Sequence, residues 1–258
     1  MVAGSGVAQQ EAVARQFGSR AASYLSSDAH ARGDDLAQLA ALARARPSAR
    51  ALDLGCGAGH ASFALAPGVR DVVAFDLSDD MLHLVASEAT RRGLGNLATR
   101  QGAVERLPFD DRDFDILVSR FSGHHWRDLQ AGLAEARRVL QPHGTAVFID
   151  VVAPPDPLLD SHLQAIELLR DPTHVRDYTE AEWRSSLARH GMPVAAHRGW
   201  RLRMHFDAWV SRSATPVHRR EAVRALIAES PAEVARHFAI GEDQSFDIDV
   251  AMFVTAGA

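Results

Sequence analysis

The chain has 258 residues, of which 47% are hydrophobic and 24% are charged, and its formal net charge at pH 7 is −5. This is the composition of an ordinary globular chain, and the acidic balance argues against broad attraction to the phosphates of nucleic acids. No apolar stretch is long enough to span a bilayer, and the single cysteine excludes an internal disulfide and a thiolate metal cluster.

Two amphipathic segments precede the first predicted strand. Residues 11–25 repeat an apolar side chain at helical spacing, ending with Tyr24, and a second such segment runs from about 34 to 45. These segments predict an N-terminal helical cap over residues 1–46.

Residues 51–59 are the most informative stretch and read Ala-Leu-Asp-Leu-Gly-Cys-Gly-Ala-Gly. The apolar run with one acid, Asp53, predicts a buried strand that ends in a tight turn. Gly55, Gly57 and Gly59 allow positive φ angles and the close approach of a ligand, and the helix that follows offers unpaired N–H groups. This geometry fits a nucleotide-like ligand.

The glycine spacing counts against a nicotinamide dinucleotide. That fingerprint has a third glycine three residues after the second, where this chain has His60. A second buried-strand pattern, residues 71–77, carries Asp76 at the offset where an acid accepts hydrogen bonds from ribose hydroxyls. Ser78 is then the expected N-cap of a helix over residues 79–91.

Strands and helices alternate through residues 47–153. Strands are predicted at 49–54, 71–76, 97–101, 113–118 and 144–151, and helices at 59–66, 79–91 and 126–140. Such alternation is typical of a parallel sheet covered by helices on both faces.

The pattern changes in residues 154–258. Asp156 and Pro157 are the expected N-cap and first residue of a helix that ends near residue 169, and Thr179 opens a capping box for another helix. Strands at 194–204 and 246–254, with helices between residues 206 and 238, complete the predicted sheet.

One domain is therefore expected over residues 1–258. It has an α/β, Rossmann-like, mostly parallel seven-stranded sheet with a helical cap before it, and lid helices and the last strands after it.

Four segments in the expected order resemble the class I S-adenosylmethionine (SAM) dependent methyltransferases, and more narrowly the ubiquinone/menaquinone C-methyltransferase group (methyltransferase type 11). They are the glycine segment 52–59, Phe-Asp-Leu-Ser at 75–78, Glu-Arg-Leu-Pro-Phe at 105–109, and Phe-Asp-Ile-Leu-Val followed by Ser-Arg-Phe at 114–121. The resemblance implies SAM as cofactor and S-adenosylhomocysteine as product.

The resemblance also implies which residues bind the cofactor. The acid after the second strand holds the ribose, the glycine loop passes under the methionine part, and the segment before Leu-Pro-Phe contacts adenine. The expected cofactor-binding residues are Asp53, Gly55, Gly57, Gly59, Asp76, Leu77, Met81, Ala103, Val104, Ser119 and Tyr24. The family commonly has an acid at the position of Ala103, so the backbone N–H of Val104 is the alternative partner for an adenine ring nitrogen.

His124 and His125 follow the fourth predicted core strand and are the candidate catalytic residues. Methyl transfer from a sulfonium needs alignment above all, and a base only where the acceptor carries a proton. Histidine titrates near neutrality and can accept that proton from a phenol or a carbon acid. The alternative is that these residues cap the next helix or pack beneath it.

A polar loop that contains His174, Arg176 and Tyr178 is a candidate substrate lid, because binding groups concentrate on long loops. The alternative is a loop whose arginines and acids bind its own helix ends. His30 in the cap and Arg120 complete the expected substrate-binding residues.

The leading hypothesis is a SAM-dependent methyltransferase that acts on a small, aromatic or enolisable acceptor. The alternatives are a non-catalytic SAM-binding module and, less favoured, a nicotinamide-dependent oxidoreductase. Residues 1–10 lack the features of a signal peptide, so we expect a cytoplasmic protein. We also expect no nucleic acid partner, because of the acidic net charge, and no metal, because the chain lacks a metal-ligand motif. The acceptor atom and the oligomeric state stay open.

Overall fold

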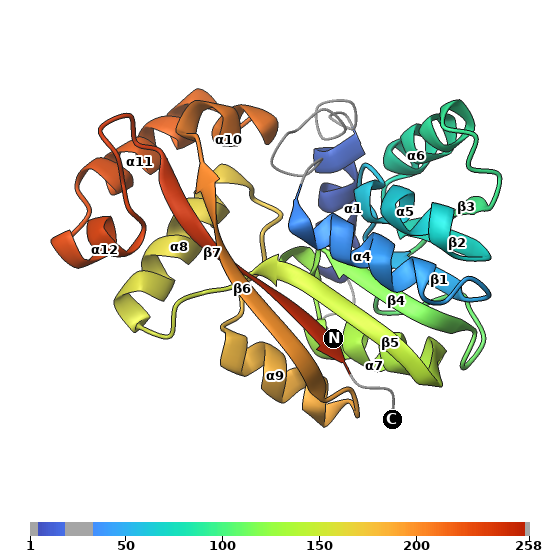
Figure 1. The fold of residues 1–258 in the computed structure, drawn as a ribbon. Helices are drawn as coiled ribbons and strands as arrows, with labels where there is room; N and C mark the ends of the chain where they lie inside the picture. Colours follow the sequence, from blue (N-terminus) through green and yellow to red (C-terminus); the bar gives the residue numbers. More distant parts are fainter. Residues whose placement is uncertain (1–4, 19–32, 256–258) are drawn as a thin grey trace.

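The computed structural model describes residues 5–18 and 33–255, and within these ranges the chain forms a seven-stranded sheet of order β3-β2-β1-β4-β5-β7-β6 (Figure 1). The strands are β1 Arg50–Leu54, β2 Asp71–Asp76, β3 Leu97–Gln101, β4 Phe114–Arg120, β5 Leu140–Val151, β6 Val194–Met204 and β7 Phe246–Thr255. Strands β1 to β5 pair in parallel, and β7 runs antiparallel to both β5 and β6. The expected mostly parallel α/β sheet is confirmed.

Helices cover both faces of this sheet. The helices that contribute to the core on one face are α4 Asp34–Arg44, α5 His60–Leu65, α6 Asp79–Arg91, α8 Pro157–Arg170, α10 Phe206–Arg212, α11 Val217–Ala228 and α12 Ala232–His237. The other face carries α7 Leu129–Val139 and α9 Glu180–Arg189. Helices α10, α11 and α12 lie with α8 beyond one end of the two antiparallel strands (Figure 1).

The central strands are apolar at nearly every position because both of their faces are buried. In β4, Ile116 and Val118 pack into the core beneath α4 and α5, whereas Leu117 between them packs into the core beneath α7. Successive side chains of a strand point to opposite faces, so a two-sided core needs a continuous apolar run.

Three predicted helix starts are confirmed. The Ser78 hydroxyl accepts a hydrogen bond from the backbone N–H of Met81, and the Asp156 carboxylate accepts one from Leu158. Thr179 and Glu182 form both hydrogen bonds of a capping box at α9. These caps bind the N–H groups that an α-helix leaves unpaired at its start.

The segment after β4 differs from the prediction of a helix over residues 126–140. Gly123–His125 forms a short 3-10 turn, η2, and α7 begins only at Leu129, with Asp128 as its N-cap. The Asp128 carboxylate accepts a hydrogen bond from the backbone N–H of Ala131, so it fixes the start of the helix. The two histidines therefore lie in a turn ahead of the helix.

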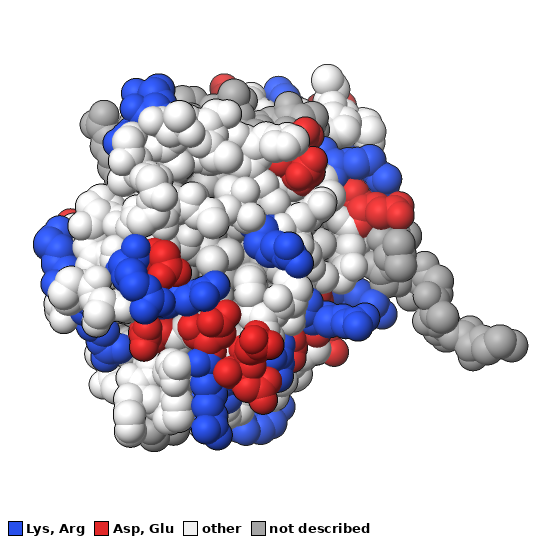
Figure 2. All heavy atoms as spheres, turned by 90° about the vertical axis from the view of Figure 1, so that its right-hand side faces the viewer, with Lys and Arg blue, Asp and Glu red and all other residues white. Residues whose placement is uncertain are grey.

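The N-terminal helix also differs from its predicted bounds. Helix α1 spans Ser5–Gly18, earlier than the predicted 11–25, and the end of that prediction lies outside the described residues. Figure 2 shows arginine and carboxylate side chains intermixed on one face of the molecule. In the described part of the chain, no helix is both long enough and apolar enough to cross a membrane.

Candidate active site

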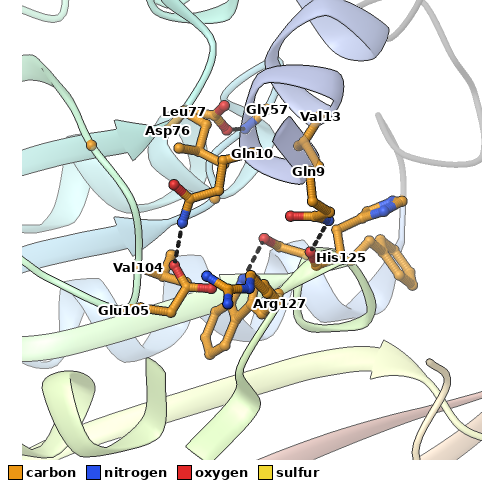
Figure 3. Close-up of a pocket in the computed structure, with 15 residues that line it drawn as sticks. Gln9, Gln10, Val13, Gly57, Asp76, Leu77, Val104, Glu105, His125 and Arg127 are labelled. Atoms are coloured by element: carbon orange, nitrogen blue, oxygen red, sulfur yellow. Dashed lines mark hydrogen bonds between the residues drawn. The ribbon is translucent and has the colours of Figure 1, made fainter. Parts of the chain in front are cut away.

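Two cavities border the loop that follows β1, and they share Gly55, Gly57 and Phe121. We call them the glycine-loop cavities. The first is lined by Gln9, Gln10, Val13, Gly55, Gly57, Asp76, Leu77, Gly102, Val104, Glu105, Phe121, Ser122, His125, Trp126 and Arg127, as Figure 3 shows. The second is lined by Asp53, Gly55, Cys56, Gly57, Ala58, His60, Ala61, Met81, Arg120 and Phe121. Both lie at the carboxyl ends of parallel strands, where open α/β sheets bind ligands.

The three glycines of the loop all have positive φ angles, +66°, +50° and +84° for Gly55, Gly57 and Gly59. A Cβ atom at Gly55 would lie 1.9 Å from the Ser122 hydroxyl oxygen, and one at Gly59 would lie 2.9 Å from Phe63. At Gly57, by contrast, a Cβ atom would meet no described atom within 4 Å. Gly55 and Gly59 are therefore needed for packing, whereas Gly57 leaves open space toward the cavities.

Asp76 at the end of β2 links this loop to the first cavity. One carboxylate oxygen accepts a hydrogen bond from the backbone N–H of Gly57 at 2.8 Å, and the other accepts one from Ser78 at 2.9 Å. Burial raises the pKa of Asp76, although these hydrogen bonds oppose the shift. The carboxylate lies among the cavity-lining residues, beside Leu77.

Asp53 lines the second cavity with one unsatisfied oxygen. Its Oδ2 accepts hydrogen bonds from the backbone N–H and the hydroxyl of Ser62, at 2.9 and 2.6 Å. Its Oδ1 is buried without a hydrogen-bond partner among the described residues, and burial raises the pKa of Asp53 to about 6. Because an unpaired buried carboxylate oxygen is costly, this atom fits a cationic group of a ligand.

The segment after β3 also lines the first glycine-loop cavity. Val104 and Gly102 line it, whereas Ala103 is not among the lining residues. Glu105 lines it as well, and its carboxylate accepts hydrogen bonds from the side-chain amide of Gln10 and the backbone N–H of Asp128. Gln10 and Glu105 were not predicted as site residues, although Glu105 opens the Glu-Arg-Leu-Pro-Phe motif.

Helix α1 covers the first cavity (Figure 3). The side-chain amide of Gln9 donates to the backbone carbonyls of His125 and Thr173, at 3.3 and 3.4 Å, and Val13 is buried beneath the helix. The predicted N-terminal cap therefore contributes lining residues. Tyr24 and His30, which were predicted to bind cofactor and substrate, lie outside the described residues.

A third cavity lies beside the first, and the two share Phe121 and His125. We call it the histidine cavity. Its lining residues are Phe121, His124, His125, Val151, Glu167, Arg170, Leu202, Met204, Trp209, Arg212 and Ile248. They come from η2, β5, α8, β6, α10 and β7, so elements far apart in the sequence build this cavity.

His124 forms a short hydrogen bond with a buried acid in the histidine cavity. Its Nδ1 lies 2.5 Å from Oδ1 of Asp150 near the end of β5, and its backbone N–H donates to Oδ2 of the same residue at 3.2 Å. Asp150 is 2% exposed. Burial lowers the pKa of His124, but the charge and hydrogen bond of Asp150 raise it to about 9. Asp150 was not predicted as a site residue.

His125 has the opposite tendency. Burial, with the neighbouring charge of His124, lowers the pKa of His125 to about 3. Its Nδ1 donates to the backbone carbonyl of Thr173 at 3.2 Å, which assigns the proton to that nitrogen. The two adjacent histidines therefore differ: one favours the charged form and the other stays neutral.

The predicted lid loop is largely buried. His174 is 7% exposed, and its Nε2 lies 3.0 Å from the side-chain oxygen of Gln164. Arg176 pairs with Asp160, and the ring of Tyr178 packs edge-on near Trp183. The three predicted residues are not among those lining the cavities above, and their role in substrate binding stays a prediction.

The remaining predicted site residues lie near the glycine loop that follows β1. Met81 lines the second glycine-loop cavity, Gly59 precedes α5, and Ser119 is buried in β4 and is not among the lining residues. Arg120 lines the same cavity, where its Nε lies 2.5 Å from Oδ2 of Asp35 on α4. This ion pair ties the N-terminal cap to the end of β4.

Phe121 connects all of these cavities. It lines both glycine-loop cavities, the histidine cavity, and a fourth cavity that borders Asp35, Arg198 and Trp200. Its φ angle is +51°, which is unusual for a bulky side chain, and its backbone N–H donates to the carbonyl of Ile149 at 2.8 Å. Such a strained residue at the junction of cavities is typical of a functional site.

Residues 52–148 match the family described as a methyltransferase domain. The chain is 40% identical over 198 residues to the uncharacterized protein YafE of Escherichia coli (strain K12), covering 77% of this chain and 96% of that protein. It is 32% identical over 229 residues to the uncharacterized methyltransferase YcgJ of Bacillus subtilis (strain 168), covering 89% of this chain and 90% of that protein.

Comparison with solved structures also finds a likeness to YcgJ. The crystal structure of YcgJ matches with a TM-score of 0.82 and 30% identity, over 86% of this chain and 97% of that chain. A demethylmenaquinone methyltransferase of Chlorobaculum tepidum is 36% identical over 105 residues, which is 40% of this chain and 41% of that protein. The likeness to YafE and YcgJ thus extends over most of the chain, and the likeness to the quinone enzyme over less than half.

Proposed function

The chain belongs to the family of SAM-dependent methyltransferases, and from this premise we propose that it transfers a methyl group from SAM to a small molecule in the histidine cavity. The observation that carries the proposal is the junction between the cavities. The glycine-loop cavities and the histidine cavity share Phe121, and the first of them also shares His125. A cofactor and an acceptor would therefore meet at these two residues.

The residues of this chain suit SAM at four points. The Asp76 carboxylate is available to the ribose hydroxyls, and the Val104 N–H to an adenine ring nitrogen. The open side of Gly57 leaves room for the methionine part. Its ammonium group fits Oδ1 of Asp53, which has no hydrogen-bond partner among the described residues. When bound, SAM supplies a methyl group on a positively charged sulfur that leaves readily. The protein then contributes alignment and the exclusion of water.

The acceptor in this proposal is a small aromatic or enolisable molecule. One wall of the histidine cavity is apolar and would pack a ring: Val151, Leu202, Met204, Trp209 and Ile248. The cavity is also lined by His124 and by the ion pair of Glu167 with Arg170, whose charged atoms lie 2.8 Å apart. A planar molecule with one acidic or hydrogen-bonding edge suits such a cavity.

Two measurements test the proposal. Calorimetric titration should show that SAM and S-adenosylhomocysteine bind and that NAD does not. Incubation with SAM and a metabolite extract should release S-adenosylhomocysteine, and the extract or SAM alone should not. Binding of SAM without release under any extract would instead support a non-catalytic SAM-binding module.

A further inference from the structure

The fold fixes the chemistry of one ring nitrogen in the histidine cavity. Oδ1 of Asp150 lies 2.5 Å from Nδ1 of His124 and also accepts from the Val151 N–H at 2.9 Å, while Oδ2 accepts from the His124 N–H. A carboxylate only accepts, so Nδ1 carries a proton. Among the described residues the His124 ring makes no further hydrogen bond, so Nε2 is the ring atom left for a bound molecule.

The charges around His124 favour its protonated form. Burial lowers its pKa, but the carboxylates of Asp150, Asp177 and Glu167 raise it to about 9. The other histidines that face it are neutral near pH 7, because burial is the main cause that lowers the pKa of His125 to about 3 and of His174 to about 4. Arg170 of α8 lines the same cavity, paired with Glu167.

We propose that the acceptor is an acidic hydroxyl compound, a phenol or an enol, and that His124, held by Asp150, binds it as the oxyanion. This inference rests on the proposed function and names the substrate class of its acceptor cavity. His124 is then a catalytic residue, because Nε2 touches the acceptor oxygen. Asp150 is a positioning residue, because it acts through His124 and keeps Nε2 directed at the cavity.

The proton balance of the step is simple. The O–H bond of the acceptor breaks as it ionises, its proton goes to solvent, and the electron pair stays on the acceptor as the nucleophile. The anion then pairs with the N–H that the protonated His124 already carries on Nε2. Methylation neutralises the acceptor, and when the methylated product leaves His124 keeps its own proton. Aliphatic alcohols are too weakly acidic to form this pair, and amines would meet a cation.

The pairing of His124 with Asp150 is tested by NMR of the imidazole nitrogens. In the wild-type protein the signal that disappears in His124→Gln should titrate well above the ordinary value of 6.5. In Asp150→Asn the midpoint should fall to 6.5 or below, because burial then acts without the opposing charge. A His124 midpoint that Asp150→Asn leaves in place would overturn the dyad.

The acceptor class is tested with 4-nitrophenol, whose anion absorbs visibly, and with 1,3-cyclohexanedione as an enol. With S-adenosylhomocysteine present, bound 4-nitrophenol should carry the anion spectrum at a pH where the free compound is mostly neutral. It should bind about 10-fold or more tightly than its methyl ether 4-nitroanisole, and His124→Gln should remove that difference.

A matched control is available in the same chain. His237 of α12 lies 3.1 Å from Asp249 of β7, outside the histidine cavity, so His237→Gln removes a comparable pair and should leave probe binding unchanged. Three results would overturn the acceptor class: a neutral bound phenol, equal binding of phenol and ether, or no binding of either probe. If SAM itself fails to bind the same preparation, the proposed function fails instead.

Discussion

The glycine-loop cavities and the histidine cavity lie against each other but depend on different parts of the chain. The first pair depends chiefly on the backbone: positive φ angles at Gly55 and Gly57, and N–H groups that bind Asp76. The histidine cavity depends on side chains brought together by distant elements, above all His124 and Asp150. Under the proposed function, cofactor binding should therefore be sensitive to backbone geometry, whereas acceptor chemistry should be sensitive to single side chains.

The largest effect is expected from Gly57→Val. A branched side chain at a φ angle of +50° is strained, and it would occupy the open space beside the loop, so SAM binding should fall below detection in calorimetry. Gly93→Val is the matched control, because Gly93 has a φ angle of +70°, no described atom near its Cβ position and no place among the lining residues. Equal losses in both variants would mean that strain alone is responsible.

The next largest effect is expected on turnover, from a change in the histidine cavity. His124→Gln should lower the turnover of an identified acceptor by roughly 10²–10⁴-fold, while SAM affinity stays nearly the same. The reason is that His124 lines the histidine cavity and not the glycine-loop cavities. His237→Gln should retain wild-type turnover. A wild-type rate in His124→Gln would mean that proximity alone drives the reaction.

A smaller effect is expected at the ribose. Asp76→Asn removes the charge that would accept the hydroxyl hydrogen bonds, so SAM should bind about 10- to 100-fold more weakly while the fold is retained. Asp71→Asn, at the other end of β2, pairs with arginines away from the cavities and serves as control. Unchanged SAM affinity in folded Asp76→Asn would contradict the assignment.

The smallest effect near neutrality is a pH dependence of SAM binding. Asp53 has a pKa of about 6, so affinity should be constant above pH 7 and drop by roughly 10-fold at pH 5, as the carboxylate that accepts the ammonium group is lost. Asp53→Asn should bind SAM weakly at every pH.

The raised pKa of Asp53 also affects the stability of the SAM-free protein. Stability should fall as pH rises through 6, because the buried carboxyl then loses its proton. Asp53→Asn should therefore have a higher melting temperature than the wild type at pH 8.

The same division explains what the sequence predicts. Gly57, Asp76 and Ser78 act through their own turn or their own helix start, so local spacing is enough to identify them. The parallel sheet follows from equally local signals, namely apolar runs alternating with helical patterns. Helix α7 begins three residues later than predicted because Asp128 is its N-cap.

The roles of Asp150 and of the loop over residues 171–178 could not be predicted from local spacing. Asp150 interrupts an apolar run in a buried strand, a signal that is visible in the sequence, but its partner His124 lies 26 positions earlier. Polar side chains of this loop bind residues that lie outside the loop. Gln164 of α8 binds His174 and the backbone of Asp177, contacts that no spacing rule predicts.

The hydrogen bonds of Gln9 have a consequence for the order of events in a catalytic cycle. This side chain on α1 binds the carbonyls of His125 and Thr173, so the helix over the first glycine-loop cavity is attached to the segment that borders the histidine cavity. Moving the helix aside breaks both bonds, at a net cost of about 1–3 kcal/mol. Under the proposed function, exchange of the cofactor is thereby coupled to the state of the acceptor cavity, and an ordered kinetic sequence is expected rather than a random one.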